Sequence, residues 1–591
     1  MCGIVGYVGS ANAKDVILSG LHKLEYRGYD SAGVALLVND KINIYKTKGR
    51  VNDLEKLVNN EISNYGIGHT RWATHGEPNY INSHPHYSES KRFIIVHNGI
   101  IENSMELKAD ILHNCKFISD TDTEVIANLI EFYSSSMSVE KSIRKTISQL
   151  EGSYAIIVLD TLDNSKMYFA KNRTPLLIGK GLNGITIASD IVALIGHSDS
   201  YISLEDKTIG EIKGNEFSLF DIIGVERDIL LKEITMKEEE VSKGDNEHFM
   251  LKEIEEQPSI IRGLISNYFD DEDINIDFDL INRIRESDKI NLVACGTSMY
   301  ACLVAKYFFE KLCAIPTEVF CASELVYSTP LITKNPFFIF LSQSGETADC
   351  ISVMKKMKFQ KYPILAITNS IESSMYNLAD YNLNIFAGKE ISVASTKAYT
   401  AQIVTCSILA KYVSNKETTL KDNLKKIALV MEKMFSYKGI IKQLASEIVK
   451  SKHAFYLGRG LDYWVSLEGA LKLKEISYIH TEAYPSGELK HGPIALITKD
   501  TPVIGIITQE GTNLITRSNI EETRARGAKC FIISTESLAK NNDDLIIPNV
   551  PHYLTPLVSA VVVQYIAYYC AVLNGNDVDK PRNLAKSVTV E

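Results

Sequence analysis

The cysteine at position 2 could act as a nucleophile that carries its own base. Removal of Met1, which a small second residue permits, would make Cys2 the N-terminal residue. A free α-amine has a pKa of about 7.7 to 8.0, so at neutral pH it can accept the thiol proton directly or through water. A lone cysteine near a terminus is otherwise a small residue that opens a first strand. The other motifs of the chain decide between these interpretations.

Further positions in the N-terminal part suit acyl transfer from an amide. Asn98 and Gly99 offer a side-chain amide and an unhindered backbone N–H, the donors that a tetrahedral oxyanion needs. An ordinary hairpin turn is the alternative interpretation of an Asn-Gly pair. Arg71 could form a bidentate pair with an amino-acid carboxylate, and Asp122 could pair with the ammonium group. Each of these two charges, taken alone, is also typical of a surface salt bridge.

A phosphate-binding loop is indicated at Ser342-Gln343-Ser344-Gly345-Glu346-Thr347. The apolar run 337–341 predicts a buried strand that delivers these hydroxyl groups to the start of a helix, where backbone N–H groups favour an anion. The loop has no Gly-Lys-Ser/Thr and is therefore not a nucleotide P-loop. A serine-rich helix cap is the alternative. The similar turn Gly296-Thr297-Ser298 favours phosphate, and Val393-Ala394-Ser395-Thr396-Lys397 could add contacts.

Candidate acid–base groups for a sugar follow further along the chain. On a helix, Glu468, Lys472 and Glu475 would share one face because of their spacing. Such a stripe is commonly a set of solvated ion pairs. Glu475 could instead move a proton between adjacent sugar carbons, while His491 helps to open the ring. Lys586 could form a Schiff base with a ketone if it is partly desolvated.

These residues lie in motifs that resemble the family of isomerizing glutamine–fructose-6-phosphate aminotransferases of the bacterial type. The sugar-isomerase motifs are those given above, together with the final stretch 577–591. The motifs typical of amidotransferases with an N-terminal cysteine are 1–6 (MCGIVG), 26–33 (YRGYDSAG), 69–76 (HTRWATHG), 97–99 (HNG) and 119–124 (SDTDTE). Both sets occur in the family's order, so the resemblance is specific and spans nearly the entire chain.

The resemblance implies a role for each matching position. Cys2 would be the nucleophile with its amine as base, and Trp72 would gate the exit for ammonia. The oxyanion hole would be formed by Asn98 and Gly99, and glutamine would be held by Arg71, Thr74, His75 and Asp122. The sugar phosphate would be bound by Thr297, Ser298, Ser342, Gln343, Ser344, Thr347 and Val393. The isomerase chemistry would be carried by Lys472, Glu475, His491 and Lys586.

The activity implied by the resemblance is the conversion of D-fructose 6-phosphate and L-glutamine to D-glucosamine 6-phosphate and L-glutamate. This is the first step of the hexosamine pathway, which leads to UDP-N-acetylglucosamine. Ammonia would pass internally from Cys2 to the sugar site, because ammonia in bulk water would be protonated and diluted. We expect no metal or organic cofactor. Members of the family work as homodimers, so His491 is expected to reach the neighbouring subunit's site.

Two other functions fit the sequence less well. An amidotransferase of the phosphoribosyl type would require a strand that ends in paired acids before a Gly/Thr phosphate loop, and none follows residue 240. A sugar-phosphate-sensing binding protein would be expected to lose Cys2, Glu475 or Lys586 and often to carry a basic helix-turn-helix segment. The chain retains all three residues and shows no such segment.

The residues assigned to the reaction with glutamine lie in a part of the chain that is expected to contain short strands with intervening helices. Residues 1–235 are expected to form a glutamine amidotransferase domain, for which the resemblance implies an N-terminal-nucleophile α/β/β/α sandwich. A polar, charged linker is expected at 236–247. It has no room for the long insertion of eukaryotic-type members. Strands are expected at 4–8, 34–38, 93–96 and 155–159, and a helix at 122–133.

Beyond the linker, strands, glycine turns and long helices alternate, as in parallel α/β sheets. An internal repeat is visible, because Gly296, Ile315, Thr317-Glu318 and Glu324-Leu325 recur 164 positions later (460 − 296 = 164) as Gly460, Ile479, Thr481-Glu482 and Glu488-Leu489. The sequence therefore predicts two copies of an α/β sugar isomerase (SIS) domain, at 280–430 and 445–591.

Composition sets the broad class of the protein. A chain of 591 residues is too long for one core. The net charge of −10 argues against a general nucleic-acid-binding surface. Ten scattered cysteines and the lack of a secretory signal suit a reducing cytoplasm. The uncharged stretch 551–575 is interrupted by Pro556 and Gln564, so we expect a buried helix there rather than a membrane span.

Overall fold

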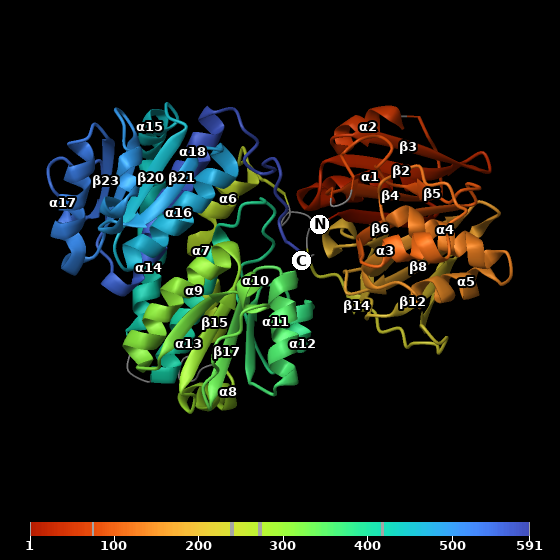
Figure 1. Ribbon diagram of the computed structural model, residues 1–591, viewed down its shortest axis with the longest axis horizontal. Coiled ribbons are helices and arrows are strands. Elements are labelled where there is room, and N and C mark those ends of the chain that lie inside the picture. Colours follow the sequence, from red (N-terminus) through yellow and green to blue (C-terminus); the bar gives the residue numbers. More distant parts are fainter. Residues whose placement is uncertain are drawn as a thin grey trace. The chain divides into compact units, whose positions relative to one another are not determined.

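The computed structural model describes residues 2–58, 60–73, 76–236, 242–269, 275–414 and 419–589. The chain forms two compact units (Figure 1). Unit 1 consists of Met1–Ser242 and Ala585–Val590, and unit 2 contains Lys243–Leu584. Part of the expected linker, 237–241, lies outside the described residues.

Two antiparallel sheets form the centre of unit 1. The eight-stranded sheet has the order β14 (Lys232–Glu233), β11 (Ser200–Ser203), β9 (Leu177–Gly181), β10 (Gly184–Ala188), β1 (Gly3–Gly9), β4 (Tyr65–Arg71), β2 (Ser31–Val38), β3 (Lys41–Lys48). The six-stranded sheet has the order β13 (Glu216–Asp221), β12 (Thr208–Lys213), β8 (Asp163–Asn172), β7 (Gly152–Asp160), β6 (Phe93–Ile101), β5 (His86–Tyr87).

Helices cover the outer face of each sheet of unit 1. The first sheet is covered by α1 (Ala13–Leu24) and α2 (Val51–Leu57), and the second by α3 (Ser104–Asp110), α4 (Thr123–Ser134) and α5 (Val139–Ile147). Because side chains alternate along a strand, β1 serves both sides of its sheet. Ile4 packs in the core between the sheets, whereas Val5 and Tyr7 pack in the core beneath α1. The four layers confirm the predicted α/β/β/α sandwich.

Unit 2 contains two five-stranded parallel sheets with the same strand order. The first is β16 (Thr317–Cys321), β15 (Lys289–Ala294), β17 (Pro336–Ser342), β18 (Ile364–Thr368), β19 (Tyr381–Asn384). The second is β21 (His480–Pro485), β20 (His453–Gly458), β22 (Pro502–Ile507), β23 (Lys529–Thr535), β24 (Leu545–Ile547). Figure 1 shows both sheets with helices packed along them.

The register of these sheets confirms the predicted duplication. Ile290 of β15 pairs with Thr317 of β16, and 164 positions later (454 − 290 = 164) Ala454 of β20 pairs with Thr481 of β21. The first strand of each sheet domain is followed by a helix, α9 (Gly296–Phe308) or α16 (Leu461–Ser477). A glycine of positive φ is the first residue of α9 (Gly296, +55°) and directly precedes α16 (Gly460, +56°). Both copies therefore use the same strand–turn–helix unit.

The remaining helices of unit 2 surround and join the two sheets. They are α6 (Phe249–Glu255), α7 (Gln257–Tyr268), α8 (Phe278–Arg285), α10 (Ala322–Leu325), α11 (Ala348–Phe359), α12 (Ser374–Leu378), α13 (Lys397–Ser414), α14 (Leu420–Met434), α15 (Lys438–Ile448), α17 (Asn513–Arg524) and α18 (Thr555–Leu573). The segment His552–Leu573, which includes α18, could cross a membrane by length and composition, but 83% of its most apolar window is buried inside the protein. It packs within one apolar core shared by both copies, as expected for a core helix.

Candidate functional site

Cys2 lies at the start of β1, next to the end of β4. Its thiol donates to the carbonyl of Trp72 at 3.4 Å, and the Trp72 N–H points back at Sγ at 3.1 Å. Burial raises the pKa of the Cys2 thiol, although the Trp72 N–H and the charge of Arg71 oppose this effect. A thiol with a raised pKa needs a base to become a nucleophile, as the N-terminal amine would supply.

Asn98 and Gly99 lie within β6, where they pair with Ala155 and Tyr154 of β7. The strand is longer than the predicted segment 93–96, so the hairpin-turn interpretation of Asn98-Gly99 is wrong. Gly99 has φ +127°, and a Cβ there would lie 2.0 Å from the carbonyl oxygen of Ser153. The Asn98 side chain donates from Nδ2 to the carbonyl of Cys2 at 2.9 Å. The structure therefore brings an amide donor and a side-chain-free backbone to the cysteine.

Arg71, at the end of β4, and Asp122, directly before α4, line the same small cavity. Burial lowers the pKa of the Arg71 guanidinium, which donates to the carbonyls of Gly76 and Glu77. Asp122 precedes α4 and accepts the Ile101 N–H at 2.8 Å. The cavity has a volume of about 20 Å³, room for roughly one water molecule. Its lining includes Cys2, Arg71, Trp72, Gly99 and Asp122. Thr74 and His75 lie outside the described residues.

The expected phosphate loop connects β17 to α11. Ser342 ends the strand, and its Oγ accepts the Gly345 N–H at 3.0 Å and lies 2.9 Å from the Thr347 hydroxyl. Ser344 Oγ accepts the N–H of Glu346 at 3.1 Å. Thr347 precedes α11 and makes no capping hydrogen bond from its side chain. The loop is thus held by its own hydroxyl groups at a helix N-terminus.

The second predicted turn lies at the start of α9 and meets the second copy of the fold. The Thr297 hydroxyl donates to Glu468 Oε1 at 3.4 Å, and Ser298 Oγ accepts from Gln402 at 2.9 Å. Two predicted positions are in contact through their backbones rather than their side chains. The Gln343 carbonyl accepts the Asn369 N–H at 3.2 Å, and the Val393 N–H donates to the Asp579 carbonyl at 3.0 Å.

Glu468, Lys472 and Glu475 share one face of α16, as predicted, but they do not form a solvated stripe. The side chains of Glu468 and Lys472 are 0% and 1% exposed, and that of Glu475 is 19% exposed. Lys472 Nζ lies 2.5 Å from Glu475 Oε2 and 3.6 Å from Glu468 Oε1. Two carboxyl groups thus flank one buried amino group.

The charges of this buried cluster follow from its packing. Burial raises the pKa of Glu468 to about 8, so its carboxyl group is largely protonated at neutral pH. Burial opposes the charge on Lys472, but Glu468 and Glu475 outweigh it, and the net pKa of Lys472 is raised. Lys472 is therefore a cation held against Glu475, the least buried member. Glu475 is the member of the cluster with the largest exposed fraction.

Two further predicted residues of the sugar site lie outside α16. His491 ends the short helix η6 (Glu488–His491), is exposed, and makes no hydrogen bond or ion pair with any described residue. Lys586 is partly exposed and belongs to Ala585–Val590, a segment that groups with unit 1.

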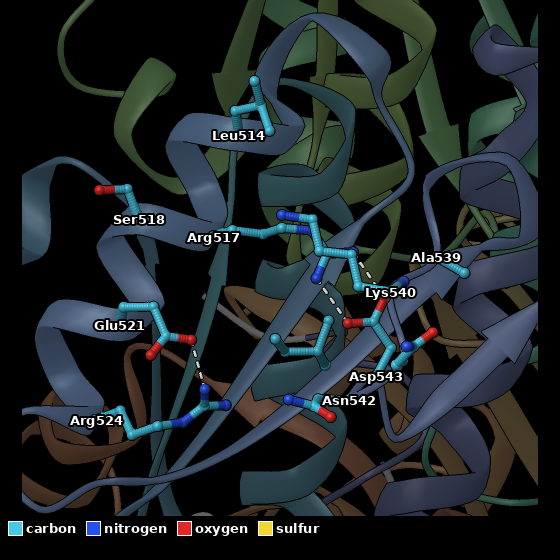
Figure 2. A pocket seen from close by; sticks show the side chains of 11 residues that line it. Leu514, Arg517, Ser518, Glu521, Arg524, Ala539, Lys540, Asn542 and Asp543 are labelled. Carbon is cyan, nitrogen blue, oxygen red and sulfur yellow. Dashed lines mark hydrogen bonds and ion pairs between the residues drawn. The ribbon is translucent and has the colours of Figure 1, made fainter.

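A cavity of about 720 Å³ lies elsewhere in unit 2, between α17 and the segment 539–543 (Figure 2). Figure 2 shows Arg517 directed at Asp543; the two form a bidentate pair at 2.6 and 2.7 Å. Arg524 pairs with Glu521 on the same wall. None of the predicted site residues lines this cavity, and the charges of its arginines are compensated by neighbouring carboxylates.

Sequence reasoning missed residues that support the predicted ones. Asp30 accepts the Ala73 N–H at 2.9 Å, next to Trp72. His69 Nε2 lies 3.0 Å from Asn98 Oδ1. Both residues stand inside motifs that the sequence singled out, 26–33 and 69–76. Gln402 lies outside these motifs, in α13.

Comparisons with known proteins agree with the division of the chain into unit 1 and unit 2. Residues 70–196 match the family described as a glutamine amidotransferase domain, and residues 283–412 and 447–574 each match the SIS domain. The glutamine–fructose-6-phosphate aminotransferase (isomerizing) of Listeria monocytogenes is 48% identical, with 100% of both chains covered. The enzyme of the same name from Staphylococcus aureus strain COL is 49% identical over the same coverage.

One solved structure resembles the C-terminal part of the chain. It is the C-terminal domain of glucosamine-fructose-6-phosphate aminotransferase from Francisella tularensis, with 35% identity and a TM-score of 0.55. The similarity covers 57% of this chain and 100% of that domain.

Proposed function

Because the chain belongs to the family of isomerizing glutamine–fructose-6-phosphate aminotransferases, we propose that its residues divide that reaction between a glutaminase site in unit 1 and a sugar site in unit 2. The enzyme converts D-fructose 6-phosphate and L-glutamine to D-glucosamine 6-phosphate and L-glutamate. In the proposal, residues 1–235 form the glutaminase domain, and the SIS domains occupy 280–430 and 445–591.

In the glutaminase step, the thiolate of Cys2 attacks the side-chain amide carbon of glutamine after its proton passes to the N-terminal amine. The negative charge of the tetrahedral intermediate falls on oxygen, where Asn98 Nδ2 and the Gly99 N–H donate to it. Collapse of the intermediate expels ammonia and leaves a γ-glutamyl thioester, which water hydrolyses to glutamate. Arg71 and Asp122 hold the α-carboxylate and α-ammonium groups, with Thr74 and His75 as further contacts.

The observation that carries this step is the 2.9 Å hydrogen bond from Asn98 Nδ2 to the backbone of Cys2. This hydrogen bond holds an amide donor beside Cys2, the residue that we propose as the nucleophile. The small volume of the cavity means that its walls must separate to admit glutamine. Trp72, which lines that cavity, is suited to gate the release of ammonia.

In the sugar step, the turn at Thr297-Ser298 and the loop of Ser342, Gln343, Ser344 and Thr347 bind the phosphate, with Val393 adjacent. Lys586 forms a Schiff base with the C2 ketone of the open-chain sugar, and ammonia displaces the lysine. Glu475 then removes a proton from C1 and returns one to C2, so that the ketose imine becomes an aldose amine. Lys472 lies 2.5 Å from the Glu475 carboxylate and stabilises its charged form.

Three features of the proposal concern the enzyme as a whole. Ammonia travels inside the protein, because in bulk water it would be protonated and diluted. The enzyme works as a homodimer in the cytoplasm, and His491 serves the partner's sugar site. The exposed position of His491 and its lack of partners among the described residues support this last assignment.

Replacement of Cys2 tests whether glutamine hydrolysis and the sugar reaction occur at separate sites. Cys2→Ala should abolish glutamine-dependent formation of glucosamine 6-phosphate. With added ammonia in place of glutamine, it should keep the rate that the wild-type enzyme shows with ammonia alone, because the sugar site is untouched. Cys115→Ala, at a partly buried cysteine of the same unit, is the control and should retain both activities. Equal loss of both activities in Cys2→Ala would refute separate sites.

A further inference from the structure

The side chain of Asn98 must present one particular end to the substrate. The two ends of a carboxamide have nearly the same shape, but Nδ2 donates hydrogen bonds while Oδ1 only accepts them. A flipped amide would place Oδ1 against the developing oxyanion and repel it. Catalysis through Asn98 therefore needs a group that distinguishes the two ends.

His69 makes this distinction from the neighbouring sheet. It lies on β4, and its Nε2 is 3.0 Å from Asn98 Oδ1 and 3.0 Å from the carbonyl oxygen of His97. Both neighbours are acceptors, so Nε2 must carry a proton and donate to them. Nδ1 of His69 has no partner among the described residues, which suits the unprotonated nitrogen of the same ring.

The surroundings of His69 keep the ring neutral and fixed in plane. Its side chain is fully buried, and burial lowers its pKa to about 3. The ring stacks on that of His84, with centroids 4.0 Å apart and planes inclined by 13°. His84 is itself held, because its Nδ1 accepts the N–H of His97 at 3.3 Å. Burial also lowers the pKa of His84, so neither ring is charged at neutral pH.

We propose that His69 is a positioning residue, whose Nε2–H holds Oδ1 of Asn98 and so directs Nδ2 towards the oxyanion. The inference rests on the oxyanion role of Asn98 proposed above. His69 itself does not exchange a proton with the substrate. Its contribution should therefore appear in the turnover of bound glutamine rather than in glutamine binding or in the reactivity of the thiol.

Substitution of His69 tests this assignment. We expect His69→Leu to lower kcat for glutamine hydrolysis by about 10- to 100-fold, less than the roughly 100- to 1000-fold that removal of an oxyanion donor costs, while KM changes by less than about 2-fold. Alkylation of Cys2 by iodoacetamide needs no oxyanion hole and should keep its wild-type rate. His69→Gln retains an N–H donor and should recover a large part of kcat. The loss in His69→Leu should be the same at pH 6.5 and pH 8.5, because His69 stays neutral throughout.

Four comparisons keep the outcome interpretable. His113→Leu, at an exposed histidine of the same unit, should have no effect. The ammonia-dependent activity reports folding of unit 2, and the alkylation rate reports integrity of the glutaminase site. Asn98→Leu should lose at least as much kcat as His69→Leu. If Asn98→Leu is impaired and His69→Leu is not, the positioning role is overturned; if neither is impaired, the oxyanion role of Asn98 fails first. A parallel fall in alkylation and kcat would mean that His69 only supports the fold.

Discussion

Among individual residues, Glu468 shows how burial changes the chemistry of a familiar helical pattern. On an exposed helix, a glutamate four residues before a lysine forms a weak ion pair. Here the Glu468 side chain is fully buried, so its carboxyl group favours the protonated form. Lys472 donates a hydrogen bond to the carboxylate of Glu475. Glu468 is therefore a neutral acid next to the charged Lys472, and the protonation states of the cluster depend on one another.

Glu468→Gln should flatten the dependence of stability on pH. The folded-state pKa of Glu468, raised to about 8, lies above the value of about 4.3 for a free glutamate. The folded protein thus holds a proton that the unfolded chain releases, and the free energy of unfolding falls as the pH rises from about 5 to about 8. Urea unfolding of wild type and variant at pH 5.5 and pH 8.5 measures this difference.

Glu510→Gln, at an exposed position of the same SIS copy, is the matched control and should keep the wild-type slope. If Glu468→Gln and wild type lost the same stability between the two pH values, Glu468 would be ionised in the folded protein and the account of the cluster would be wrong.

The types and spacing of the three residues in the buried cluster could be predicted from the sequence, but their burial could not. The i, i+4, i+7 spacing placed Glu468, Lys472 and Glu475 on one face. Whether that face meets water depends on α9, more than 150 residues earlier, whose Thr297 reaches Glu468. The support that His69 gives to Asn98 was likewise hidden, because it depends on the stacking of two sheets.

Among the elements, the pairing of β6 with β7 determines the backbone geometry of the proposed glutaminase site. Gly99 sits opposite Tyr154 in a regular antiparallel register, yet its φ of +127° is a conformation that other residues rarely adopt. The absence of a side chain lets β7 approach and leaves the Gly99 N–H free of a neighbouring Cβ. The geometry of the proposed site therefore depends jointly on β6, on β7 and on Cys2 at the start of β1.

Gly99→Ala should separate these strands and disable the glutaminase site. A Cβ would lie 2.0 Å from the Ser153 carbonyl oxygen, so β6 or β7 must shift and the Asn98 amide must move with it. We expect kcat for glutamine hydrolysis to fall by about 100-fold or more, with the ammonia-dependent reaction unchanged. Steady-state assays of both reactions measure this. Gly214→Ala, at a turn of the same unit with open space around the glycine, is the control.

If Gly99→Ala hydrolysed glutamine at the wild-type rate, the proposed oxyanion geometry would be refuted.

Strands and helices with a clear apolar period could be predicted from the sequence, whereas strands that depend on pairing with a neighbouring strand could not. The segments 4–8, 34–38, 93–96 and 155–159 all fall within strands, and 122–133 corresponds to α4, because apolar residues recur there with the correct period. Short strands such as β5 and β14 have two residues each and exist only through pairing with a neighbour. The extension of β6 past Asn98 also depends on its pairing with β7.

At the scale of the whole molecule, the proposed mechanism needs a second copy of the chain. Glu475 and the exposed His491 belong to the same chain, but the proposal assigns them to different sugar sites. Glu475→Gln and His491→Gln should each be inactive alone. When the two variants are co-expressed, about half of the dimers are mixed, and each mixed dimer rebuilds one of its two sites, which gives about one quarter of the wild-type activity.

The amount of glucosamine 6-phosphate formed by the purified mixture measures this complementation, with Glu475→Gln co-expressed with itself as the control. A mixture as inactive as its parents would place His491 in the site of its own chain.

The most direct test of the central claim, that one enzyme couples the two sites, follows the amide nitrogen of glutamine. The enzyme is incubated with amide-¹⁵N-glutamine, fructose 6-phosphate and excess unlabelled ammonium, and the product is analysed by mass spectrometry. We predict that ¹⁵N enters glucosamine 6-phosphate with little dilution, because in the proposed mechanism ammonia passes between the sites without mixing with bulk water. Product labelled in proportion to the bulk ammonium would contradict internal transfer, and glutamine hydrolysis without any amino sugar would contradict the assignment of the sugar site.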